Sequence, residues 1–163
     1  MKCIRRKEKE MKDKDEMKAV LGEAKYITIA MCKNNEPYLV TVNHGYDGEN
    51  NCIYFHCAKE GKKIDILKGH NRVWGQALID KGYVQEACDH LYATTQFRGK
   101  VIFLEDLEEK RYALEVMIKA LENDPDKVIE AQLSEKSIAK VQIGRIDIEY
   151  MSGKKSKNVI ISL

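Results

Sequence analysis

Residues 38–73 read YLVTVNHGYDGENNCIYFHCAKEGKKIDILKGHNRV, and they carry the clearest indication of the fold. Apolar residues alternate over 38–43, which is typical of a half-buried strand. Turn residues at 46–50, with Asp47-Gly48 among them, separate this strand from a second one at 52–57. A short helix is predicted next, at 59–69, with Gly69 as its stop. Short strands joined by tight turns indicate an antiparallel sheet.

The same strand patterns continue on both sides of this stretch. Further strands are predicted at 25–31, 72–80, 92–104 and 137–150, a final edge strand in the closing NVIISL, and helices at 107–122 and from Pro125. So many antiparallel strands in one domain tend to close on themselves. We therefore expect a mainly β (α+β) protein, an antiparallel β-barrel with peripheral helices. One domain over 1–163 is expected, with a charged N-terminal helix at 1–23, the barrel at 24–150 and a tail at 151–163.

The composition excludes several classes of protein. The chain has 163 residues, 44% of them hydrophobic, and a formal net charge of +2, which excludes a disordered chain. No apolar run approaches the roughly 20 residues of a membrane span, and the charged residues 1–18 lack a signal-peptide core. A basic nucleic-acid-binding arm at 1–18 is the weaker alternative, because acidic residues interleave with the basic ones. Five cysteines without a CxxC pair indicate a reduced, cytoplasmic protein.

An anion site is predicted at Gly61-Lys62-Lys63, where a helix opens directly after a strand and loop. The first amides of a helix lack intrahelical partners, and the helix dipole makes that end positive. Two lysines add full charges, and glycine lets a ligand approach the backbone closely. The site would suit a phosphate-sized anion. The alternative is that Lys62 and Lys63 are ordinary solvated lysines.

Other polar residues stand at positions that could meet a ligand. Thr94, Gln96 and Arg98 alternate along one strand, so they share a face that either looks outward or contacts a ligand. Asn43 ends its strand, and His56 shares a face with Tyr54. Soft metal ligands also occur, at Cys52, His56, Cys57, Cys88 and His90. Their spacing matches no zinc template, so no metal site is predicted.

The central block resembles the flavin-binding split-barrel superfamily of pyridoxine 5′-phosphate oxidase, and within it the branch of nitroimidazole-resistance proteins. The shared pattern is a strand ending Val-Asn, an Asp-Gly hairpin, then I-Y-F-H-x-A-x-x-G-K-K-x-D-x-L and N-x-V. These elements stand at 42–43, 47–48, 53–67 and 71–73 of this chain. TTQFRGKVIFLED and RIDIEYMSGK fit the later strands. The resemblance covers roughly residues 5 to 155.

The resemblance implies FMN bound at a homodimer interface, with a small-molecule electron donor or acceptor as partner. The net charge of +2 and the lack of a long apolar run predict neither a nucleic-acid nor a membrane partner. It places the strand from Tyr38 to Asn43 along the flavin ring, and Lys62 and Lys63 on the phosphate. The implied cofactor-binding residues are Tyr38, Val40, Thr41, Val42, Asn43, His56, Cys57, Lys62, Lys63, Thr94 and Gln96, where Gln96 is the alternative register to Thr94. His56 matches a histidine discussed as functional in this branch. A hydrogen-bonded structural role for His56 is the alternative.

The chain departs from the vitamin B6 oxidases of the superfamily at its C-terminal end. Those enzymes carry a Trp and an Arg there, whereas Trp74 is the one tryptophan here and the chain ends KNVIISL. The expected activity is therefore that of a small flavin-dependent reductase or oxidase on another substrate. Haem held by one of His44, His56, His70 or His90, a deazaflavin, and a non-catalytic flavin carrier or sensor remain alternatives.

Overall fold

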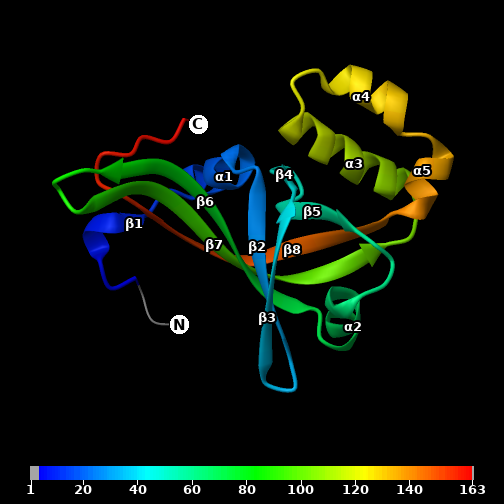
Figure 1. Cartoon of the computed structure of the whole chain (residues 1–163), viewed down its shortest axis with the longest axis horizontal. Helices are drawn as coiled ribbons and strands as arrows, with labels where there is room; N and C mark the ends of the chain where they lie inside the picture. Colours follow the sequence, from blue (N-terminus) through cyan, green and yellow to red (C-terminus); the bar gives the residue numbers. More distant parts are fainter. Residues whose placement is uncertain (1–3, 163) are drawn as a thin grey trace.

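The fold is built around one antiparallel sheet. The computed structural model describes residues 4–162. The strands are β1 Glu10–Met11, β2 Tyr26–Lys33, β3 Glu36–Asn43, β4 Gly45–Asp47, β5 Cys52–Cys57, β6 Arg72–Val84, β7 Asp89–Leu104 and β8 Gln142–Lys155. They follow the order β3-β2-β6-β7-β8-β5-β4, with β1 paired to β8 off this path (Figure 1).

The sheet curls until its two ends meet. β3 stands at one end of the strand order, yet it contacts β5 near the other end. Within residues 4–162, no strand pairing joins β3 to β5, so the barrel stays split along this line. The predicted mainly β, antiparallel split barrel with peripheral helices is confirmed.

Alternating side chains fill the barrel, as the sequence pattern predicted. Ile27, Ile29 and Met31 of β2 are buried, and β3 pairs with β2 over its whole length. Aromatic rings from β5 and β7 complete the centre, where Phe55 and Phe97 are fully buried. Such burial of large apolar side chains is the main favourable contribution to folding.

Over residues 4–162, five α-helices pack around the sheet. They are α1 Lys14–Glu23, α2 Lys62–Gly69, α3 Leu107–Leu121, α4 Pro125–Gln132 and α5 Glu135–Lys140. α3 contacts β4 and β5, and α4 and α5 pack on α3, whereas α2 lies at the other end of these strands, against β2 (Figure 1). Pro125 occupies the first turn of α4, as predicted. No helix within residues 4–162 is long and apolar enough to cross a membrane.

The N-terminal segment differs from the prediction of one charged helix over 1–23. The helix begins only at Lys14, where the Asp13 side chain accepts a hydrogen bond from the amide of Asp15. Before it lie a single 3-10 turn, Lys7–Lys9, and the two residues of β1. Met11 of β1 is buried where this strand pairs with β8. Pairing with the sheet therefore stabilises this segment more than a solvated helix would. Residues 1–3 lie outside the described part of the chain.

The strand predicted at 137–150 begins later and ends later in the structure. Ser134 caps a short helix by accepting a hydrogen bond from the amide of Ser137, so residues 135–140 are helical. β8 then begins at Gln142 and continues to Lys155, into the part that we expected to be a tail. The expected edge strand in NVIISL is also absent over residues 158–162. Val159 and Ile161 are instead buried against the core without strand pairing.

Candidate functional site

The N-terminus of α2 carries no side-chain cap within the described chain. Gly61 stands at the cap position with φ 125° and ψ 169°, a conformation in the region that favours glycine. A glycine cap offers no side-chain oxygen to the first amides of the helix, and among the described residues its carbonyl accepts only from the Asp65 amide, over 3.1 Å. The amides that open α2 are therefore free to bind an anion, at the positive end of the helix dipole.

Lys62 and Lys63 leave this turn toward opposite edges of the split barrel. The Lys62 Nζ lies 4.6 Å from the centre of the Tyr38 ring on β3. The Lys63 Nζ lies 5.4 Å from the centre of the Phe55 ring on β5. Cation–π contacts of this kind hold a lysine near the ring without neutralising its charge. The two charges thus flank the line along which the barrel is split.

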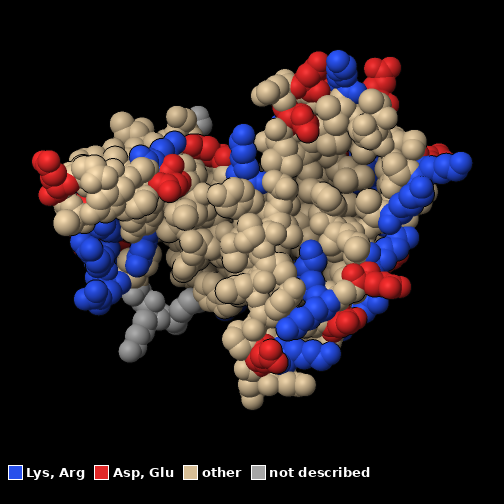
Figure 2. Space-filling view, viewed as in Figure 1, with Lys and Arg blue, Asp and Glu red and all other residues tan. Residues whose placement is uncertain are grey.

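A surface pocket of about 320 Å³, here called the α2 pocket, opens beside Lys62. It is lined by Lys33, Asn34, Glu36, Tyr38, Lys62, Asp65 and Ile66. Figure 2 shows lysine and arginine side chains gathered at the end of the molecule that holds α2, with acidic side chains among them. Glu36 lies 3.9 Å from the Lys62 Nζ, but this carboxylate is itself highly exposed and its attraction is screened by water.

His56 and Cys57 are the last two residues of β5, shortly before α2 in the chain. His56 is exposed, unlike Tyr54 on the same face, which is buried. Cys57 is half-buried, and burial raises the pKa of its thiol, while the nearby Lys63 ammonium opposes that rise. The predicted residues His56, Cys57, Lys62 and Lys63 are therefore brought to one end of the barrel.

The predicted residues on β3 divide between the two faces of the sheet. Tyr38, Val40 and Val42 are half-buried against the core. Thr41 and Asn43 face outward, where the Thr41 hydroxyl lies 3.1 Å from that of Thr28. The Asn43 amide donates to the carbonyl of Lys25 over 3.0 Å. A ligand lying along the β3 backbone would meet apolar groups on one side and hydroxyl and amide groups on the other.

Thr94 and Gln96 lie apart from the α2 pocket within one chain. They stand on the outer face of β7, three strands from β3 in the sheet order, a separation of roughly 14 Å at ordinary strand spacing. The Thr94 hydroxyl donates to the Ala77 carbonyl over 2.8 Å, and Gln96 contacts Gln76 across the strands at 3.5 Å. In a single chain this face of β7 therefore looks outward.

The outer face also exposes large apolar side chains that the sequence analysis did not select. Leu39, Trp74 and Leu78 are 63%, 38% and 44% exposed. A second pocket of about 350 Å³ lies among them, lined by Thr28, Ala30, Leu39, Trp74, Gly75, Gln76 and Gln96. The sequence did carry a signal for this patch. Residues 72–79 have apolar side chains on both faces of the strand, whereas apolar and polar side chains normally alternate along a half-buried strand.

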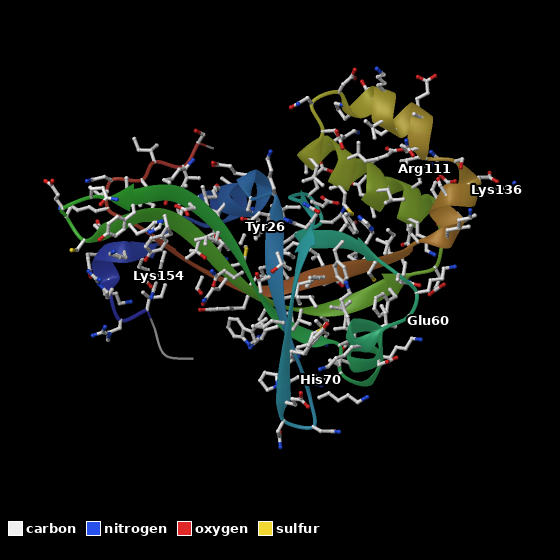
Figure 3. All side chains as sticks on the ribbon, viewed as in Figure 1. Tyr26, Glu60, His70, Arg111, Lys136 and Lys154 are labelled. Atoms are coloured by element: carbon white, nitrogen blue, oxygen red, sulfur yellow. The ribbon has the colours of Figure 1, made fainter. Side chains whose placement is uncertain are left out.

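The histidines differ in how far their rings are already engaged. His44 is buried and donates from Nε2 to the Leu21 carbonyl over 2.8 Å, and burial lowers its pKa. His90 contacts Asp80 at 2.7 Å on the surface. His70 ends α2 and lines a surface pocket with the β2–β3 turn (Figure 3). In residues 4–162, no group of three or more His, Cys, Asp and Glu side chains could hold a metal ion.

Comparison with known proteins identifies the family. The sequence profile named pyridoxamine 5′-phosphate oxidase matches residues 13–155, which is most of the chain. The chain belongs to the pyridoxamine 5′-phosphate oxidase family. The match spans the barrel from α1 to β8 and includes both the α2 pocket and the outer face. The family resemblance seen in residues 38–73 is thereby confirmed. The search of curated proteins finds no match to this sequence.

Solved structures of the same architecture support this assignment. A proposed 5-nitroimidazole antibiotic resistance protein from Bacteroides thetaiotaomicron is 27% identical, with a TM-score of 0.76, over 89% of this chain and 85% of that one. A flavocytochrome from Azotobacter vinelandii has a TM-score of 0.79 at 16% identity, over 94% and 72%. An FAD-binding protein from Mesorhizobium loti has a TM-score of 0.64 at 21% identity, over 88% and 95%. The latter two show a shared fold.

Proposed function

We propose that the chain is an FMN-binding flavoprotein that acts as a small flavin-dependent oxidoreductase. The observation that carries this proposal is the uncapped start of α2, where Gly61 leaves the first amides free beside Lys62 and Lys63. A helix start with two added cations suits a doubly charged terminal phosphate better than the singly charged phosphates of a pyrophosphate bridge. FMN ends in such a phosphate, whereas FAD does not.

The flavin binding of similar proteins supports the proposal. The Mesorhizobium loti protein is FAD-binding, the Azotobacter vinelandii protein is a flavocytochrome, and the Mycobacterium smegmatis protein of similar fold binds FAD and haem. Bound FMN would supply the redox chemistry, in the form of electron transfer through its ring system. The protein's own contribution would be to hold the phosphate, to place the ring along β3 and to exclude water.

The residues of this chain would share that work. Lys62, Lys63 and the free amides of α2 would bind the phosphate. The Tyr38–Asn43 strand would present its backbone and the Thr41 and Asn43 side chains to the ring. His56 is exposed at the end of β5. It is the titratable group of this set best placed to exchange protons with a substrate.

The homodimer is proposed from the outer face of the sheet. Leu39, Trp74 and Leu78 expose apolar surface there, and Thr94 and Gln96, which the family resemblance assigns to the flavin, lie on the same face. A second copy seated on this face would cover the apolar side chains. It would also bring one protomer's Thr94 and Gln96 toward the flavin held by the other. The two separate groups of predicted residues would then form one site.

Replacing Leu39 with Asp is expected to weaken this dimer at least tenfold, because each copy would bury a carboxylate in place of a leucine. Sedimentation velocity over a concentration series measures the dissociation constant. Ile160→Asp, at a highly exposed apolar residue near the C-terminal end, is the matched control. An unchanged sedimentation profile for Leu39→Asp would contradict the proposed interface.

Titration of the purified protein with FMN, followed by flavin fluorescence and absorbance, tests the proposed function. We expect saturable binding of one FMN per chain, then loss of the yellow absorbance when NADH or NADPH is added without oxygen. A Soret band with no flavin binding would indicate a haem protein. Bound FMN that neither nicotinamide cofactor reduces, and that reduces no nitro compound, would indicate a carrier.

A further inference from the structure

A further pocket, distinct from the proposed flavin site, lies between α3, the β4–β5 turn and the strands β5 and β8. Its volume is about 390 Å³. Its lining includes Asn50, Tyr54, Glu108, Glu109, Tyr112 and Arg145, and we call it the α3 pocket. None of these residues lines the α2 pocket. The α3 pocket therefore needs an explanation of its own.

Two tyrosine rings form a corner of this pocket. The rings of Tyr54 and Tyr112 lie 6.2 Å apart between centres and are inclined by 88°. Tyr54 is buried in the floor, while Tyr112 is 45% exposed. The Tyr112 hydroxyl donates to the Asp47 carboxylate over 3.0 Å, which fixes the ring at the pocket wall. Perpendicular aromatic walls are a common way to surround an organic cation.

A buried carboxylate stands behind this corner without a counter-charge. Asp47 is only 5% exposed, and it forms no ion pair with any residue in 4–162. Burial alone would raise its pKa, yet hydrogen bonds from Asn50, Tyr112 and the Glu49 amide lower the pKa below its usual value. Asp47 therefore stays ionised at neutral pH, and its negative charge lies directly behind the Tyr112 hydroxyl.

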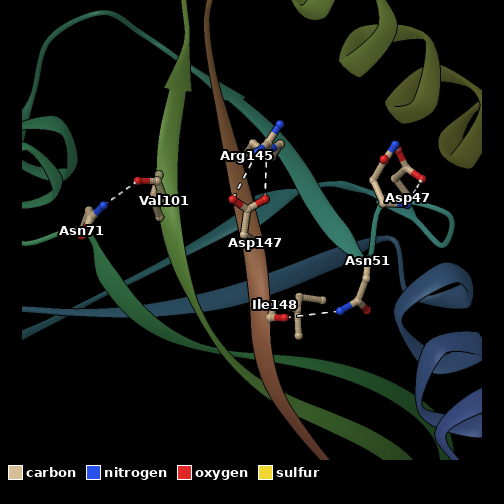
Figure 4. Close-up of polar contacts among 8 residues, drawn as sticks. Asp47, Asn51, Asn71, Val101, Arg145, Asp147 and Ile148 are labelled. Atoms are coloured by element: carbon tan, nitrogen blue, oxygen red, sulfur yellow. Dashed lines mark hydrogen bonds and ion pairs between the residues drawn. The ribbon is translucent and has the colours of Figure 1, made fainter.

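The other charges at the α3 pocket increase this negative potential. Glu108 and Glu109 line it from the first turn of α3, and neither side chain forms an ion pair with a residue that the structure describes. Arg145 brings a positive charge, but its Nε and Nη2 bind the two oxygens of Asp147 at 2.8 and 3.2 Å. Figure 4 shows this pair on β8 and Asp47 near α3. A bidentate pair is close to neutral, and the positive end of the α3 dipole offsets only about half a charge, so Asp47, Glu108 and Glu109 leave this region net negative.

We infer that the α3 pocket binds a small organic cation, an ammonium group carried on a ring or a short alkyl chain. The ammonium group would lie against the Tyr112 ring, facing Glu108 and Glu109. Its apolar substituents would fill the space above Tyr54. The cation would thereby balance part of the negative charge of Glu108, Glu109 and the nearby Asp47. This inference does not depend on the proposed flavin function.

Three probes that share a benzyl or phenyl group and differ in charge test the inference. We expect calorimetry to show benzyltrimethylammonium binding at least tenfold more tightly than neutral benzyl alcohol, with benzoate weakest. Amide shifts in a ¹H–¹⁵N spectrum should map to β5 and the first turns of α3. Absent binding, tighter binding of benzoate, or shifts confined to other elements would each overturn the inference.

Substitutions in the full chain separate the ring from the charges. Tyr112→Leu is expected to weaken binding of benzyltrimethylammonium at least fivefold, whereas Tyr112→Phe keeps the ring and should stay within twofold. Glu108→Gln with Glu109→Gln changes two surface side chains and should also weaken binding at least fivefold. If Tyr112→Leu melts early, the Glu108→Gln, Glu109→Gln pair still decides the question. Unchanged cation affinity in that pair would contradict the inference, and FMN affinity should be unaltered in every variant.

Discussion

The double substitution Lys62→Ala, Lys63→Ala is expected to weaken FMN binding by about 100-fold or more. A hydrogen bond to a charged group contributes roughly 1.5–3 kcal/mol, and each 1.4 kcal/mol corresponds to about a tenfold change in affinity. The low end of that range applies, because the Lys62 side chain is 60% exposed and its charge is screened. Riboflavin lacks the phosphate, so its affinity should change less than about threefold.

A matched variant separates this local effect from a change in net charge. Lys68→Ala with Lys127→Ala also removes two positive charges, from exposed positions in the last turn of α2 and in α4. Fluorescence titration of FMN should give nearly wild-type affinity for this control. Equal losses in the two variants, or an FMN affinity within twofold of wild type for Lys62→Ala, Lys63→Ala, would refute the phosphate assignment.

The second large effect is expected on stability, from Gly99→Ala in β7. The pairing of β7 with β8 shifts by one residue between Arg98 and Gly99, which marks a β-bulge in β8. At this bulge the backbone of β8 comes very close to Gly99. An added methyl carbon would lie 2.3 Å from the Asp147 carbonyl oxygen and 2.9 Å from a methyl group of Ile146. The oxygen belongs to the backbone of a central strand and cannot move aside cheaply.

We therefore expect Gly99→Ala to lower the free energy of unfolding by about 3 kcal/mol. That corresponds to a fall in Tm of roughly 6–12 °C for a chain of this size. Thermal unfolding followed by circular dichroism measures it. Gly22→Ala is the control, since beyond its own helix and chain neighbours the added carbon meets nothing within 4 Å, and alanine favours the helix α1. Equal melting of Gly99→Ala and wild type would show that the strand contact is looser than described.

Local patterns in the sequence predicted most of the sheet. The alternation of Ile27, Ile29 and Met31 identified a buried face without any knowledge of the neighbouring strands, because side chains alternate across every strand. The start of α2 was predicted for the same kind of reason. A glycine followed by two lysines after a strand predicts a helix start from local sequence alone, and α2 does begin at Lys62 with Gly61 as its cap.

The errors fell where tertiary contacts outweigh local preference. The run SIAKVQIGR contains enough β-branched residues to resemble a strand, but the Ser134 cap turns its first part into α5. Met11, within the charged N-terminal segment, pairs with β8 and is buried there, and no helix pattern in the sequence could predict this contact.

The candidate sites also depend on tertiary contacts that the sequence alone does not show. Leu39 and Trp74 become a surface patch only because the sheet places β3 and β6 on either side of β2. The α3 pocket joins Tyr54 to Tyr112, which are far apart in sequence and have no shared motif. Only the α2 site is compact enough in sequence to be predicted before the fold is known.

A crystal structure of the protein soaked with FMN would show where the FMN phosphate binds. We predict the phosphate at the first amides of α2, within hydrogen-bond reach of the Lys62 and Lys63 ammonium groups. The rival cationic cluster is on β6 and β7, where Arg72, Arg98 and Lys100 surround Glu149 at 3.5–3.8 Å. A phosphate bound at that cluster, or FMN absent from the α2 site at saturating concentration, would contradict the account.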